Sequence, residues 1–157
     1  QDNFIAEIAN DNSEGQIVLS GKNKDLEKLS SFLKENKIKN VKLPVSAPFH
    51  CSLMSEATEI MREELNKLKF KKGRNPLISN ITADEIFNAE ELKNLLVKQI
   101  ENRVRWRESV VTMINKGVNQ FIEIGPGKVL SGLIKRINNK VKIISINNEE
   151  DIRSIKI

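Results

Sequence analysis

Short β-branched runs alternate with stretches of helical periodicity along the chain, and this alternation limits the folds that are open to it. Residues 16–20, 118–124 and 141–146 have the composition of strands. Between such runs, apolar residues recur every three or four positions, as they do in helices that pack on a sheet. We therefore predict an α/β fold with a mostly parallel sheet.

The first 46 residues predict the order strand, strand, helix, strand. Residues 4–9 and 38–43 are the outer strands of this order, and the turn-forming residues 10–15 separate the first strand from the second. Asn23 is expected to cap the helix. This order is what a ferredoxin-like fold retains when its opening strand and helix are removed.

Beyond residue 46, capping and turn residues predict where further elements begin and end. Ser52 is placed to cap a helix, and Asn88 with Glu91 three residues later resembles a capping box. Residues 77–81 predict a short strand, and Gly117 is expected to end a later helix. The apolar stripe expected for the helix after Ser52 is Ala57, Ile60, Met61, Leu65 and Leu68.

Cysteine and histidine each occur once, which excludes an internal disulfide and leaves no cluster of metal ligands. We expect no metal, and the single thiol fits a reducing cytoplasm. The net charge of +5 suits an acidic partner, but the lysines are scattered and do not form a nucleic-acid footprint. No apolar run approaches the roughly 20 residues that span a bilayer. We therefore expect neither nucleic acid nor a membrane as a partner.

His50 is a candidate general base because Pro44 and Pro48 hold its segment rigidly before a helix. The alternative is a histidine that packs or caps at the helix start, and spacing alone favours this structural role. Cys51 is a candidate thiol nucleophile. Neighbouring side chains on an extended turn point apart, however, so a structural cysteine is favoured. No Gly-x-Ser-x-Gly segment that would carry a nucleophilic serine occurs in the chain.

Three further polar segments have both a structural and a functional interpretation. Gln99 lies on an apolar helix stripe, either as a packing compromise or as part of a polar site. Residues 10–16 form an Asx-rich turn or line a pocket with their amides, and the turn is favoured. The run Gly125-Pro126-Gly127-Lys128 follows a strand and can bind phosphate through main-chain N–H groups. A tight turn is favoured here too, because the Walker pattern is absent.

Four of these segments together resemble the malonyl-CoA:acyl carrier protein transacylases of bacterial fatty-acid synthesis. They occur in the order and at the spacing of that family and cover nearly the whole chain. The segments are residues 10–21, residues 43–51, the run Asn102-Arg-Val-Arg-Trp106 with Gln99 just before it, and residues 123–133. Within the first of them, Asp11 and Glu14 depart from the usual pattern of the family.

The resemblance implies a large α/β-hydrolase-like subdomain with a small ferredoxin-like subdomain inserted in it. Residues 1–46 would then complete most of the small subdomain, and residues 47–157 would be the C-terminal part of the large one. The chain begins with Gln1 and not with Met, so we expect that it was processed, trimmed or taken from a longer protein.

The resemblance also implies a reaction, in which malonyl passes from malonyl-CoA to the phosphopantetheine thiol of acyl carrier protein through a seryl ester, without a cofactor. His50 would be the general base, and the main-chain carbonyl of Gln99 would orient its imidazole, so that the Gln99 side chain matters less than its position. Asn12 and Gln16 would belong to the wall of the substrate pocket. The family's nucleophilic serine has no counterpart here. We therefore expect a missing N-terminal half as a further partner and an inactive isolated chain.

Two alternatives remain open from the sequence. A non-catalytic fragment that binds acyl carrier protein is suggested by the net charge of +5, because carrier proteins are strongly acidic. An acyltransferase domain of a polyketide synthase is the other alternative. Phe49, before His50, is compatible with malonyl over bulkier units by resemblance only.

Overall fold

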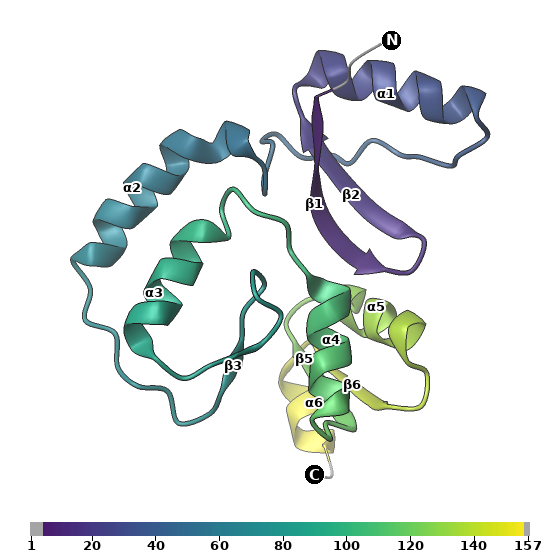
Figure 1. The fold of residues 1–157 in the computed structure, drawn as a ribbon. Coiled ribbons are helices and arrows are strands. Elements are labelled where there is room, and N and C mark those ends of the chain that lie inside the picture. The colour runs from purple at the N-terminus through teal and green to yellow at the C-terminus, as the bar shows by residue number, and fades with distance from the viewer. Residues whose placement is uncertain (1–4, 156–157) are drawn as a thin grey trace.

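The computed structural model describes residues 5–155 and shows an α/β chain in three groups of elements (Figure 1). A hairpin with one helix comes first, two helices with a second hairpin follow, and helices around a parallel strand pair form the C-terminal group. None of the helices within residues 5–155 is long and apolar enough to cross a bilayer. The elements are β1 Ala6–Ser13, β2 Gln16–Gly21, α1 Asn23–Glu35, the 3₁₀ turn η1 Ser52–Met54, α2 Ser55–Asn66, β3 Leu77–Ile78, β4 Glu85–Ile86, α3 Ala89–Lys98, α4 Trp106–Asn115, β5 Gln120–Ile124, α5 Val129–Ile137, β6 Lys142–Ile146 and α6 Glu149–Ser154.

β1 and β2 form an antiparallel hairpin that is longer than the sequence predicts. Residues 10–13, expected in a turn, continue β1, and the chain turns only at Glu14 and Gly15. Gly15 has φ 73°, a left-handed conformation that suits glycine. The predicted turn is therefore confined to Glu14 and Gly15, and its extension over residues 10–13 was wrong. Pairing with β2 outweighs the turn preference of the Asn and Asp residues.

The ends of this first group also differ from prediction. Phe4, expected in the first strand, lies outside the described residues. Lys22 and not Asn23 is the N-cap of α1, and no side chain caps that helix start. Residues 38–43 are irregular and not a strand, and Val41 is 74% exposed. No strand within residues 5–155 pairs with this segment, and an alternating sequence forms a strand only where a neighbour completes the hydrogen-bond ladder.

The helix after Ser52 begins differently from the expected cap. Ser52 starts a 3₁₀ turn, and its main-chain N–H and its hydroxyl both donate to the Glu7 carboxylate of β1. Met54 is the N-cap of α2, without a side-chain cap. Much of the stripe predicted to face inward is exposed, including Ile60 at 57% and Leu68 at 54%. α2 therefore covers little of its apolar face within the described chain.

Asn88 caps α3 as predicted, because its Oδ1 accepts from the N–H groups of Glu90 at 2.8 Å and Glu91 at 3.1 Å. The strand predicted over residues 77–81 is confined to β3 and pairs antiparallel with β4. The tight turn between these two strands packs next to α3 and carries residues of the site described below.

A hydrophobic core with Val110, Phe121 and Ile134 at its centre holds together α4, β5, α5 and β6. Gly117, at φ 95°, follows α4 and ends it as predicted. β5 and β6 are parallel, whereas the other two described strand pairs are antiparallel. The expected mostly parallel sheet therefore holds only for this group, because alternating strands and helices do not reveal which strands pair.

Candidate active site

His50 occupies a strained position in the rigid segment between α1 and η1. Its φ is 61°, a left-handed conformation that is uncommon for residues other than glycine. The main-chain N–H of His50 donates to the Ile100 carbonyl at 3.1 Å, which holds the segment against the end of α3. Such conformations persist where the surroundings impose them, and they concentrate at functional sites.

The His50 ring meets the main chain of Gln99, in the arrangement that the family resemblance implies. Nδ1 lies 2.7 Å from the Gln99 carbonyl oxygen. A carbonyl oxygen only accepts, so Nδ1 carries the hydrogen, and Nε2 of the neutral ring is left with a lone pair. One tautomer and one ring direction are thereby selected, as a general base requires.

Gln99 is the C-cap residue of α3, and this explains why its carbonyl is available. Carbonyl groups in the last turn of a helix have no partner within the helix. The Gln99 N–H donates to the Leu95 carbonyl at 3.0 Å, and the Asn102 side chain donates to the Lys98 carbonyl at 2.7 Å. Leu95 and Val97 are buried and fix the helix against its neighbours. The helix end is thus held while one carbonyl points at His50.

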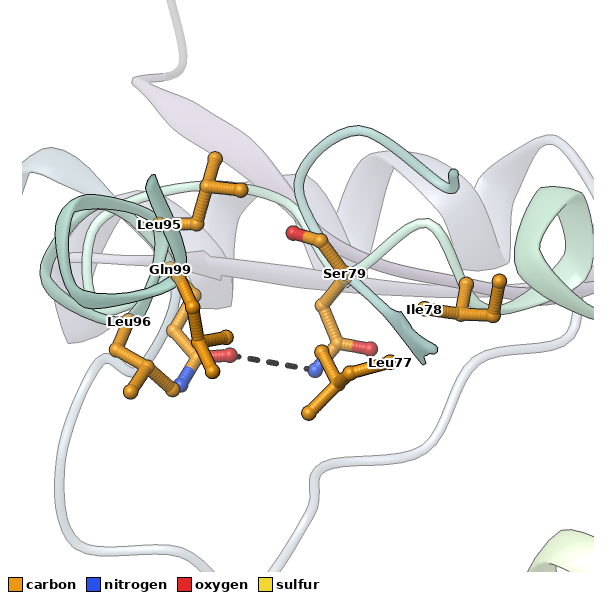
Figure 2. Close-up of a pocket in the computed structure, with 8 residues that line it drawn as sticks. Leu77, Ile78, Ser79, Leu95, Leu96 and Gln99 are labelled. Atoms are coloured by element: carbon orange, nitrogen blue, oxygen red, sulfur yellow. Dashed lines mark hydrogen bonds between the residues drawn. The ribbon is translucent and has the colours of Figure 1, made fainter. Parts of the chain in front are cut away.

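A hollow of about 250 Å³ lies between α3 and the β3 segment, and the side chain of Gln99 forms part of its wall (Figure 2). The Asn80 side-chain amide donates to Gln99 Oε1 at 3.3 Å. Asn80 is not among the site residues expected from the sequence. The sequence feature that could have indicated Asn80 is its polar side chain near the end of the apolar, strand-like run of residues 77–81. The lining residues are Leu77, Ile78, Ser79, Asn80, Leu92, Leu95, Leu96 and Gln99.

Arg105 connects this hollow to the start of α4. Its main-chain N–H donates to the Asn80 carbonyl at 3.0 Å, and its guanidinium donates to the carbonyls of Ile81 at 3.1 Å and Thr82 at 2.9 Å. The same guanidinium pairs with Glu108, with Nε 2.9 Å from Oε2. This hydrogen bond lowers the pKa of Glu108 and raises that of Arg105, so the pair stays charged.

Asn12 and Gln16, the expected pocket residues, lie near the tip of the β1–β2 hairpin. Gln16 Oε1 accepts a hydrogen bond from Arg136 of α5. Within the described residues, no hydrogen bond connects either residue to His50. The hairpin reaches the segment before α4 through main-chain bonds in both directions between β1 and Val104, at 2.8 and 2.9 Å. The structure thus brings His50 and Gln99 together and leaves Asn12 and Gln16 on a separate element.

No family model matches the chain. The chain is 43% identical over 149 residues to the malonyl CoA-acyl carrier protein transacylase of Bacillus subtilis (strain 168). This alignment covers 94% of this chain and 47% of that protein. It is 41% identical to the Staphylococcus aureus (strain COL) transacylase over 97% of this chain and 50% of that protein. The crystal structure of the Clostridium perfringens transacylase matches with a TM-score of 0.89 and 41% identity, over 95% of this chain and 47% of that chain. The chain is therefore similar, over nearly its whole length, to one half of the malonyl-CoA:acyl carrier protein transacylases.

The chain spans about half the length of the curated relatives it matches. That coverage agrees with the expected correspondence to a C-terminal half, and the structural matches confirm the predicted α/β fold class. A malonyl-transacylase solved in complex with a type II PKS acyl-carrier protein also matches, with a TM-score of 0.90 and 34% identity over 96% of this chain and 49% of that chain.

Residues of the chain itself pair with main-chain groups of the glycine-rich turn at residues 125–128 and of the helix start after it. The Glu123 carboxylate accepts from the N–H groups of Leu130 at 3.0 Å and Ser131 at 2.8 Å, in the first turn of α5. Hydrogen bonding to Ser131 lowers the pKa of Glu123. The Gly127 N–H donates to the Asn147 side chain at 2.7 Å. Several N–H groups of the turn and of the first turn of α5 are thus already paired, which supports the tight turn.

Cys51 is fully buried beside the candidate base. Its Sγ lies 3.1 Å from the Pro48 carbonyl, to which the thiol donates. This position supports the structural role that the sequence favours. Among residues 5–155, no three His, Cys, Asp or Glu side chains lie where they could hold a metal ion.

Proposed function

We propose that this chain is the base-bearing part of an enzyme that transfers malonyl from malonyl-CoA to the phosphopantetheine thiol of acyl carrier protein. The observation that carries the proposal is the 2.7 Å contact between His50 Nδ1 and the Gln99 carbonyl in a chain that is similar to the transacylases. In this proposal the residues 1–46 belong to a small ferredoxin-like subdomain, and residues 47–157 to the large subdomain. The enzyme works in the cytoplasm and uses no cofactor.

In the proposed first half-reaction, His50 Nε2 takes the proton of a serine hydroxyl as the serine oxygen attacks the malonyl thioester carbonyl. The C–S bond then breaks, and the imidazolium returns the proton to the coenzyme A thiolate. In the second half-reaction, Nε2 takes the proton of the carrier thiol, whose sulfur attacks the seryl ester. The proton finally returns to the serine oxygen. Asn12 and Gln16 form part of the wall around the acyl group.

The serine belongs to a segment that this chain does not contain, because none of its serines lies in a Gly-x-Ser-x-Gly elbow. We therefore expect the 157-residue chain alone to transfer no malonyl when it is incubated with malonyl-CoA and carrier protein. Robust malonyl transfer by the isolated chain would contradict the proposal that the nucleophilic serine lies outside the segment that carries His50.

The decisive experiment uses the longer coding sequence. We expect a Gly-His-Ser-x-Gly segment upstream of Gln1, and malonyl transfer by the longer protein. His50→Ala in that protein should lower kcat/KM at least about a hundredfold, the lower range for losing a general base. Activity that survives this substitution would remove the proposed role of His50.

A non-catalytic module that binds acyl carrier protein is the second candidate, and the net charge of +5 favours it. The malonyl-transacylase solved with its acyl-carrier protein supports carrier binding in this family, and it keeps a polyketide-synthase context open. Titration of the chain with carrier protein at low and moderate salt tests this candidate, because binding between opposite charges weakens with salt. Binding that salt does not weaken, or no binding, would reject it.

A further inference from the structure

The Gln99 carbonyl lies at the C-terminal end of α3, where main-chain hydrogen bonds restrain it only in part. Gln99 is the C-cap of α3, and within residues 5–155 no main-chain N–H donates to its carbonyl. The next N–H, that of Ile100, makes only a long 3.3 Å bond back to the Val97 carbonyl. Helix ends fray readily, so the direction of this carbonyl needs an additional restraint.

That restraint comes from the opposite wall of the hollow. The Asn80 amide donates to Gln99 Oε1 at 3.3 Å, and Figure 2 shows the Gln99 side chain directed toward the segment that carries Ser79. Asn80 is itself anchored, because its carbonyl accepts the main-chain N–H of Arg105 at 3.0 Å. The Arg105 guanidinium holds the next two carbonyls of the same turn.

We infer that Asn80 is a positioning residue for His50 and acts through Gln99. The contacts form one continuous path: the turn held by Arg105 fixes Asn80, Asn80 fixes the Gln99 side chain, and Gln99 presents its carbonyl to His50 Nδ1. A fixed carbonyl keeps the hydrogen on Nδ1, and it holds Nε2 pointing in one direction. The catalytic meaning of this arrangement rests on the proposed function, whereas the ring geometry can be measured without it.

The chain offers a direct probe, because His50 is its only histidine and its ring signals in NMR spectra need no assignment by mutation. Asn80→Leu keeps the approximate shape of the side chain and removes the donor. We expect the Hδ1 proton of His50 to exchange with water about fivefold faster, as for the loss of one ordinary hydrogen bond, and the other neutral tautomer to become populated.

Two further variants separate positioning from general damage. Asn80→Asp should restore the slow exchange, because the Gln99 amide can rotate and donate to the new carboxylate. Asn94→Leu makes the same change on the exposed side of α3 and should leave the His50 ring as in the unmodified chain. Gln99→Leu should match Asn80→Leu, and the double variant should add nothing to either.

The inference is overturned if Asn80→Leu leaves the ring signals unchanged, or if Asn94→Leu changes them equally. Should Asn80→Leu lose the dispersed amide spectrum of a folded chain, Asn80→Asp and Gln99→Leu decide alone: an unchanged ring in Gln99→Leu rejects the path. In the longer enzyme, Asn80→Leu should lower kcat several-fold with KM for malonyl-CoA unchanged. A ring that responds in an enzyme whose activity survives His50→Ala would reject the proposed function and leave the positioning intact.

Discussion

Two hydrogen bonds join Asp11 of β1 to Arg107 of α4, two residues that are 96 positions apart in the sequence. Nε donates to Oδ1 at 2.9 Å and Nη2 to Oδ2 at 2.7 Å, in the fork geometry that suits arginine and carboxylate. The Asp11 side chain is only 9% exposed, whereas that of Arg107 is 47% exposed. This pair therefore attaches the hairpin that carries Asn12 to the C-terminal group.

The first prediction concerns acid stability. The hydrogen bond from Arg107 lowers the pKa of Asp11 below 3.8, against the opposing effect of burial. A lowered folded-state pKa means that the stabilisation is present above the unfolded pKa and is lost as pH falls through the folded value. Between about pH 5 and pH 3, the unmodified chain should lose about 1 kcal/mol more unfolding free energy than Asp11→Asn, a modest figure because solvent screens the half-exposed Arg107.

Urea unfolding at several pH values measures this difference. Glu63→Gln, an exposed change on α2, is the matched control and should follow the unmodified chain. Parallel pH profiles for the unmodified chain and Asp11→Asn would show that the pair contributes nothing to acid stability.

The second prediction concerns the left-handed backbone of His50, at φ 61°. Glycine adopts this conformation without the Cβ strain that alanine suffers, which is about 1 kcal/mol or more. His50→Gly should therefore be more stable than His50→Ala by about 1 kcal/mol, although both lack the ring. At a position with ordinary helical dihedrals the order would reverse. Chemical denaturation of the two variants tests the backbone independently of catalysis.

The third prediction concerns the thiol of Cys51, which is fully buried and donates to the Pro48 carbonyl. A buried structural thiol should react with an aromatic disulfide reagent only when the chain unfolds. Cys51→Ala should cost about 1 kcal/mol of unfolding free energy through a small cavity and a lost bond, and it should leave the His50 ring signals in place. Rapid labelling of the folded chain would instead indicate an accessible nucleophile.

The fourth prediction concerns Glu123, whose carboxylate caps the first turn of α5 from the preceding strand. Glu123→Ala should cost about 1 kcal/mol, the usual effect of removing a capping acceptor. Because its pKa is lowered, chiefly through Ser131, the contribution is present above the unfolded pKa and disappears as pH falls through the folded value. The melting temperatures of the unmodified chain and Glu123→Ala should therefore differ at neutral pH and converge at acidic pH. A difference that stays constant with pH would argue against the carboxylate charge as the cause.

The fifth prediction concerns the isolated chain as a whole. Several large apolar side chains are well exposed, among them Ile124 at 79%, Val129 at 72% and Val41 at 74%. Exposed apolar surface of this kind favours association. We expect sedimentation to show self-association that increases with concentration, and thermal melts to show marginal stability. A monomer with a sharp, high-temperature transition would contradict this expectation.

Local signals predicted the parts of the fold that depend on neighbouring residues. Asn88 caps α3 and Gly117 ends α4, because capping and left-handed termination act within one helical turn. The same kind of signal failed at Ser52, whose hydroxyl and N–H donate to Glu7 from another element. It failed again at residues 38–43, where the alternating pattern has no partner strand in the described chain.

The candidate site also combines features that the sequence predicted with contacts that only the structure shows. His50 and the rigid segment around it were recognisable from residue types, and the family resemblance paired His50 with Gln99. The sequence by itself determined where most helices lie, the cap at Asn88 and the motifs, since these rest on local preferences and spacing. Only the tertiary structure decided that Asn80 reaches Gln99 and that Asp11 binds Arg107. Those contacts join residues far apart in the chain, and their geometry follows from packing that no local pattern encodes.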